Sequence, residues 1–126
     1  MIAATSVVPI ELPRAEVFDY LANRENLPGW LGDADTAVWE TVRIVADART
    51  GVVDIWWRGT GAWDAGVLPV RILDTHPARC VVTVTCFEDR PNDAGEAGHG
   101  LAVRVAQLDR RLAELPERIE GQLRRA

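Results

Sequence analysis

The chain has 126 residues, of which 48% are hydrophobic and 26% are charged, and its net charge is −5. This length and composition are typical of one folded domain with its own core, and they argue against a disordered segment. The acidic charge argues against a broad electrostatic contact with nucleic acid or with an anionic membrane. All 14 basic residues are arginines, which excludes Schiff-base chemistry on a lysine and a phosphate site built on a P-loop lysine.

The first thirty residues predict a strand followed by two short helices. Residues 5–12 are rich in β-branched side chains and Pro13 ends the run, so we expect a strand there. Pro13 also favours the start of a helix. Apolar residues then recur at helical spacing, at Val17, Phe18, Leu21 and Ala22. Residues 23–28 interrupt this pattern, and a short second helical turn is indicated by Leu27, Trp30 and Leu31.

Four further strands are expected in the middle of the chain, at 36–46, 51–58, 66–74 and 79–89. The links between them are short and contain glycine, proline or aspartate, which favours antiparallel neighbours. Side chains alternate along these strands, so apolar residues such as Val53 would share one face and polar residues such as Asp54 the other. We expect the apolar face to line an interior and the polar face to meet water.

Two cysteines stand in the last of these strands, at Cys80 and Cys86. They would share one face but lie about 20 Å apart along it, which is too far for a disulfide between them. Two buried free thiols suit a reducing compartment. No apolar run reaches the length of a membrane span, and the first residues lack the pattern of a signal peptide. We therefore expect a cytoplasmic protein.

The clearest pattern is a helical stripe in the last thirty residues. Apolar residues recur there at spacings of four and three, at Leu101, Val105, Leu108, Leu112, Leu115 and Ile119. Pro116 must kink or interrupt this helix, because proline lacks the backbone N–H. The stripe could pair with another chain as a coiled coil. However, the sheet needs a cover for its apolar face, so we expect packing within the chain and a monomer or weak homodimer.

The order of these elements resembles the SRPBCC superfamily, which includes START domains, polyketide cyclase/dehydrase proteins and the pollen-allergen type. Four stretches carry the resemblance: PIELPRAEVFDYLANRENLPGWL (9–31), GVVDIWW (51–57), CVVTVTCFEDRPND (80–93) and LAVRVAQLDRRLAELPERIEG (101–121). They cover nearly the whole chain and imply a single domain over 1–126. The implied class is an α+β helix-grip fold, in which a curved antiparallel sheet wraps around a long C-terminal helix and two short helices follow the first strand.

Two departures from the superfamily pattern stand out. The chain holds about four strands between residues 36 and 90, where fuller members have six, so the sheet would be shorter. Pro116 also falls where relatives usually continue an unbroken helix. Superfamily members share no catalytic signature, so the resemblance is specific for the fold and weak for the activity.

The resemblance implies a pocket for a small hydrophobic or aromatic molecule. Three interpretations are compatible with it: an enzyme of the polyketide cyclase or dehydratase type, a non-catalytic carrier or sensor, and an interaction module that uses the C-terminal helix. We expect the pocket to be lined by Trp57, Val70, Val84, Cys86 and Leu101. Trp30 would lie near its entrance, and Arg104 could reach an anionic group inside it.

An enzyme would need an ionisable group in that pocket, and the candidates are Asp54, Glu88 and His99. Asp54 is more typical of a surface pair with Arg71 or Arg43, and it would turn inward only if the register slipped by one residue. Glu88 falls at a strand end on the apolar face, where half-burial would raise the pKa of its carboxyl. The sequence contains no metal-ligand spacing, dinucleotide fingerprint or nucleophile elbow, so we expect no metal and no cofactor.

Overall fold

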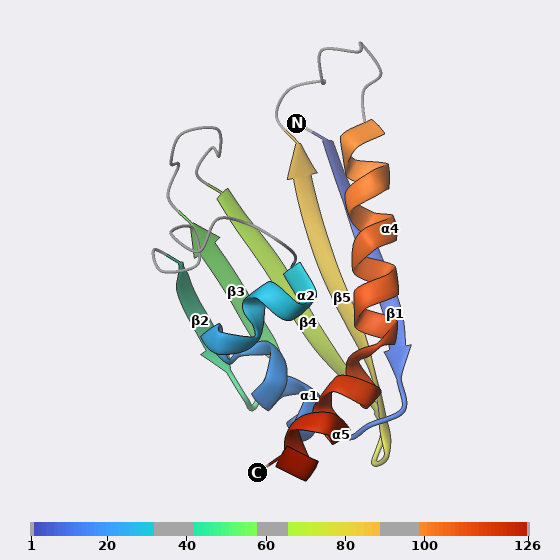
Figure 1. The fold of residues 1–126 in the computed structure, drawn as a ribbon. Helices are drawn as coiled ribbons and strands as arrows, with labels where there is room; N and C mark the ends of the chain where they lie inside the picture. The colour runs from blue at the N-terminus through green and yellow to red at the C-terminus, as the bar shows by residue number, and fades with distance from the viewer. Residues whose placement is uncertain (1, 32–41, 58–65, 89–98, 126) are drawn as a thin grey trace.

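The computed structural model of the protein describes residues 2–31, 42–57, 66–88 and 99–125. Five strands form one antiparallel sheet in the order β1-β5-β4-β3-β2 (Figure 1). The strands are β1 (Ile2–Ile10), β2 (Arg43–Asp47), β3 (Val52–Trp57), β4 (Gly66–His76) and β5 (Arg79–Glu88). The helices are α1 (Arg14–Leu21), the 3-10 turn η1 (Arg24–Asn26), α2 (Leu27–Leu31), α4 (His99–Ala113) and α5 (Leu115–Arg125).

All helices lie on one face of the curved sheet (Figure 1). Helix α4 packs along β1 and β5, α1 packs on β4, α2 contacts α4, and α5 contacts α1. This is the helix-grip arrangement that the sequence predicts, with two short helices after the first strand and a C-terminal helix over the sheet. None of the described helices has the length and apolar character needed to cross a membrane.

The alternation of side chains along the strands is confirmed. Most residues that face the helices are buried and form one apolar cluster, against which the partly buried Ile44 packs: Val53, Ile55, Leu68, Val70, Ile72, Val82, Val84 and Cys86. Their neighbours along the chain face outward, where Arg43 and Trp56 are exposed. Cys80 is also buried, and both cysteines are free. One face of the sheet therefore supplies half of the buried core residues.

Several strand boundaries differ from the prediction, and the first strand ends at Ile10 instead of residue 12. Strand β1 begins at Ile2 because its first residues pair with the end of β5, Ala3 opposite Phe87 and Ala4 opposite Cys86. Alanine has a low strand propensity, so only the partner strand reveals this extension. Strand β4 continues to His76, since the hairpin to β5 is tight. Most of the strand predicted at 36–46 lies outside the described residues.

The predicted long C-terminal helix is two helices that meet at Glu114. The amide of Glu114 donates to the carbonyl of Arg111 (3.2 Å), and the carbonyl of Glu114 accepts from the amide of Arg118 (3.2 Å). Pro116 stands in the first turn of α5, where its missing N–H costs little. The stripe is buried within the chain at Leu101, Leu108, Leu112, Leu115 and Ile119. It is therefore covered by the sheet and α1, as expected, and is not available for a coiled coil.

Candidate functional site

The interior of the grip is the candidate site. Its described walls are mainly apolar, apart from Ser6 of β1, which is fully buried opposite Val84 and donates a hydrogen bond to Asp109 of α4. Val70 of β4 and Val84 of β5 are direct cross-strand partners, and both are fully buried. Cys86 lies two residues further along the same face of β5, and Leu101 contributes from the first turns of α4. All four belong to one apolar cluster. These four residues could contact a ligand through dispersion, and none of them carries a charge.

Trp30 brings a fully buried polar atom without a described hydrogen-bond partner into this core. The sequence prediction placed Trp30 near an entrance, but the side chain is fully buried, because α2 packs against α4. Its indole Nε1 has no hydrogen-bond acceptor among the described residues. A buried donor without an acceptor is rare in folded proteins and costs free energy until an acceptor is supplied.

The thiol of Cys86 is neutral at physiological pH. Burial raises the pKa of this thiol above its ordinary value of 9.0, and the positive charge of Arg104 opposes part of that effect. Arg104 is an exposed residue of α4, and its predicted contact with an anionic group of a ligand remains a prediction. The nucleophilic form of cysteine is the thiolate. Cys86 therefore contributes an apolar surface and no nucleophile.

Asp54 faces away from the interior. It stands between the buried residues Val53 and Ile55, and its carboxylate oxygen Oδ1 lies 2.7 Å from Nη1 of Arg71 on the next strand. The Asp54 side chain is 24% exposed and that of Arg71 is 41% exposed. The register has not slipped, so the inward placement that catalysis would require is wrong. The pair is the surface contact that the sequence favours, of a kind worth about 1 kcal/mol or less.

Three other predicted residues lie at one end of the grip. Trp57 is the last residue of β3, Glu88 the last of β5 and His99 the first of α4. Figure 1 shows these three ends at the same, upper edge of the molecule. Their side chains lie outside the described part of the structure, as do Trp39 and Trp63. The catalytic roles of Glu88 and His99 and the pocket role of Trp57 remain predictions.

No group of three or more histidine, cysteine, aspartate or glutamate side chains could hold a metal ion within the described ranges. His76 is exposed and structural, because its Nδ1 accepts a hydrogen bond of 3.0 Å from the amide of Ala78 in the hairpin turn. Two polar features were not anticipated from the sequence. One is the unpaired indole of Trp30, and the other is a groove at Tyr20 in which arginines of α5 take part.

No protein-family model matches this chain, and no curated protein matches it. Solved structures do match. The di-domain ARO/CYC BexL from the BE-7585A biosynthetic pathway has a TM-score of 0.60 at 16% identity over 89% of this chain. The chain spans only 46% of BexL. Protein MLL2253 from Mesorhizobium loti has a TM-score of 0.51 at 16% identity, with 86% of this chain and 96% of that protein covered.

At these identities the likeness concerns the fold. The chain is an α+β protein with a helix-grip fold.

Proposed function

We propose that this protein binds a small planar hydrophobic molecule in the interior between the sheet and helices α2 and α4. The ligand would have an apolar body and one hydrogen-bond acceptor, such as a carbonyl or phenolic oxygen. The observation that carries the proposal is the buried indole N–H of Trp30, which lies in the core and has no acceptor among the described residues. Apolar walls with a few polar groups are typical of small-molecule sites.

The described residues favour binding without catalysis. Cys86 is a neutral thiol and Asp54 points outward, so neither supplies an acid or base to the interior. The structural likeness to BexL, an ARO/CYC protein, supports a ligand of the aromatic or polyketide class. An activity of the cyclase or dehydratase type would depend on Glu88 or His99, the remaining ionisable candidates. The carrier or sensor interpretation needs no such group.

The neutral fluorophore prodan tests the proposal, because it combines a planar naphthalene with one carbonyl group. We expect saturable binding with a blue shift of its emission in the wild-type protein. Leu101→Asn should weaken binding about tenfold or more, because it places an amide in the apolar wall. Val103→Asn is the matched control, since Val103 lies two residues away on the same helix and is 47% exposed.

Thermal melts of both variants establish that the fold is retained. Equal binding by Leu101→Asn and the wild type, or no saturable binding by the wild type, would contradict an interior site.

A further inference from the structure

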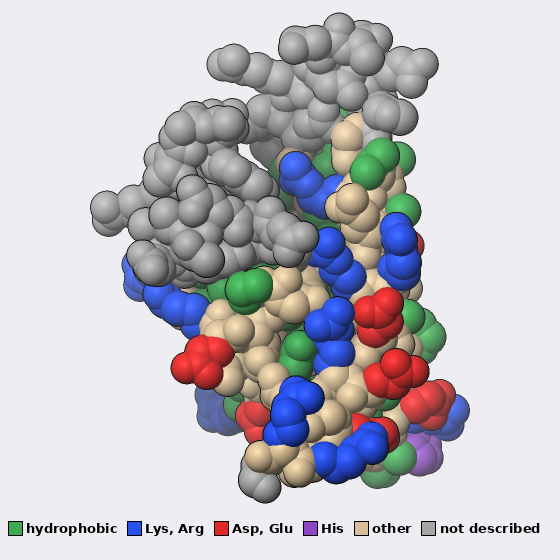
Figure 2. All heavy atoms as spheres, viewed as in Figure 1, with side chains coloured by type: hydrophobic (Ala, Val, Ile, Leu, Met, Phe, Trp, Pro, Cys, Tyr) green, Lys and Arg blue, Asp and Glu red, His purple; other side chains and the backbone are tan. Residues whose placement is uncertain are grey.

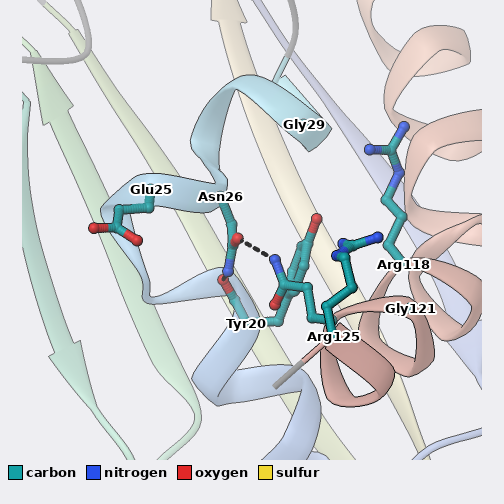
Figure 3. Close-up of a pocket in the computed structure, with 8 residues that line it drawn as sticks. Tyr20, Glu25, Asn26, Gly29, Arg118, Gly121 and Arg125 are labelled. Carbon is teal, nitrogen blue, oxygen red and sulfur yellow. Dashed lines mark hydrogen bonds between the residues drawn. The ribbon is translucent and has the colours of Figure 1, made fainter.

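A solvent-open groove of about 360 Å³ lies between the first helices and α5, outside the interior. One wall comes from α1, η1 and α2, and the other from α5 (Figure 3). The lining residues are Tyr20, Glu25, Asn26, Gly29, Arg118, Gly121, Gln122 and Arg125. The volume falls at the lower end of the range for small-molecule sites.

One hydrogen bond within a wall and one between the two walls fix the shape of this groove. The buried amide of Asn26 donates from Nδ2 to the carbonyl of Tyr20 (3.0 Å) and accepts at Oδ1 from Nε2 of Gln122 (2.7 Å). The second bond joins η1 to α5 across most of the chain and is drawn in Figure 3. The groove is therefore held open by the fold and does not depend on a ligand for its shape.

The hydroxyl of Tyr20 is a donor without a partner at the centre of the groove. The residue is only 6% exposed, and no described residue hydrogen-bonds its hydroxyl. A Cβ atom on Gly29 would lie 3.3 Å from the Tyr20 hydroxyl oxygen and 3.2 Å from Nη1 of Arg118. The hydroxyl and the guanidinium therefore converge on the space that the missing side chain of Gly29 leaves.

Two guanidinium groups border this space, and one of them has no anionic partner. Arg118 uses Nη2 for a 3.3 Å ion pair with Glu114, which leaves Nη1 on the groove side. No described carboxylate pairs with Arg125. Glu25 also belongs to the lining, but Figure 3 shows its carboxylate pointing away from both guanidinium groups. The groove thus holds one guanidinium group, that of Arg125, without a described carboxylate partner, beside the free Nη1 side of Arg118.

The positive charge extends beyond the groove in a regular series. Arginines recur every seven residues along the C-terminal helices, at Arg104, Arg111, Arg118 and Arg125. Figure 2 shows arginine side chains following one another down α4 and α5, on the side that borders α1 and α2. In a protein of net charge −5, such a series would favour the approach of small anions to this side of the molecule.

We infer that this groove binds a small organic anion through its carboxylate or phosphate group. Arg125 and Arg118 would hold the oxyanion by charge-assisted hydrogen bonds, which planar guanidinium groups form with good geometry. The Tyr20 hydroxyl, which lies beside Gly29, would donate a further hydrogen bond to the oxyanion. The groove is separate from the interior site proposed above, so its ligand need not be the hydrophobic molecule.

The probes are benzoate, phenyl phosphate and the neutral analogue benzamide, titrated into the wild-type protein and followed by calorimetry and amide NMR shifts. We expect benzoate or phenyl phosphate to bind saturably with shifts at Gly29 and Gly121, and benzamide to bind at least about tenfold more weakly, because it lacks the charge. The oxyanion that binds more tightly identifies the ligand class. Prodan binding should be unchanged by a saturating anion.

Three variants locate the site. Arg125→Gln should weaken anion binding about tenfold, and Tyr20→Phe should weaken it several-fold, since each removes a hydrogen bond to the oxyanion. Arg124→Gln is the control, because it removes the same charge from an exposed arginine that pairs with Glu120 outside the groove. Equal binding of benzamide and benzoate, no saturable anion binding, or an equal loss in Arg124→Gln and Arg125→Gln would overturn the inference.

Discussion

A polar side chain with a hydrogen-bond partner in the protein has a structural role, whereas a buried polar side chain without a partner is a candidate for ligand binding. Asp54 has its partner in Arg71 and lies on the outer face, where the pair supports the sheet. The Trp30 indole has no described acceptor, although the ring is fully buried. An unpaired donor in a core is the residue-level reason to look for a ligand there.

Trp30→Phe tests this reasoning, because it keeps an aromatic ring and removes only the indole N–H and part of the ring area. We expect prodan to bind about two- to tenfold more weakly, through loss of the hydrogen bond to its carbonyl. The emission of the bound dye should also move further to the blue. Trp56→Phe is the matched control, since Trp56 is 48% exposed on the outer face. Identical emission for both variants and the wild type would show that the indole does not meet the ligand.

At one described turn between the strands, the backbone conformation disfavours any residue with a side chain. The turn from β2 to β3 contains Gly51, whose φ of 69° is in the left-handed region that favours glycine. Its amide donates to the carbonyl of Asp47 (3.0 Å), and its own carbonyl accepts from the amide of Ile72 (2.8 Å). A Cβ at this position would lie 2.3 Å from the Ile72 carbonyl oxygen, so the turn is also locked against β4.

Gly51→Ala should therefore lower the free energy of unfolding by about 1–3 kcal/mol, because both the φ angle and the close approach become strained. The matched substitution is Gly121→Ala in α5, where the new Cβ would meet only the Arg125 guanidinium at 3.6 Å. There the change should raise stability by up to about 1 kcal/mol, through helix propensity. Urea unfolding curves measure both effects. A Gly51→Ala protein as stable as the wild type would refute the account of this turn.

The sequence predicted elements well where a pattern repeats within one segment. Alternation placed Val53 and Ile55 inward and Asp54 outward, and the stripe around Leu108 and Leu112 marked the buried side of the C-terminal helices. These predictions needed only the period of a strand or a helix. The break at Pro116 followed from the chemistry of proline alone.

Features that join distant segments could not be predicted in the same way. Tyr20 and Arg118 converge at Gly29 only because α5 turns after Glu114 and packs on α1. The burial of Trp30 likewise depends on where α2 meets α4. The spacing of seven residues between the arginines of the C-terminal helices indicates that they share one face. It does not indicate which segment of the chain packs beside that face.

At the scale of the whole molecule, one sheet face, α2 and α4 enclose an apolar interior, while the opposite sheet face carries the Asp54–Arg71 pair and scattered exposed apolar residues. The central claim is that a planar hydrophobic ligand enters this interior and does not adsorb to the outer face. The two faces offer distinguishable methyl groups. Val70, Val84 and Leu101 are buried, whereas Val7, Val45 and Leu73 are exposed on the outer side of the sheet.

Intermolecular nuclear Overhauser effects between prodan and assigned methyl groups test the claim most directly, because they report contacts within about 5 Å, the separation of side chains across neighbouring strands. The account predicts effects from the naphthalene protons to the methyls of Val70, Val84 and Leu101, and none to those of Val7, Val45 and Leu73. Effects confined to the three exposed residues would contradict it, and so would saturable binding without any contact to the buried three.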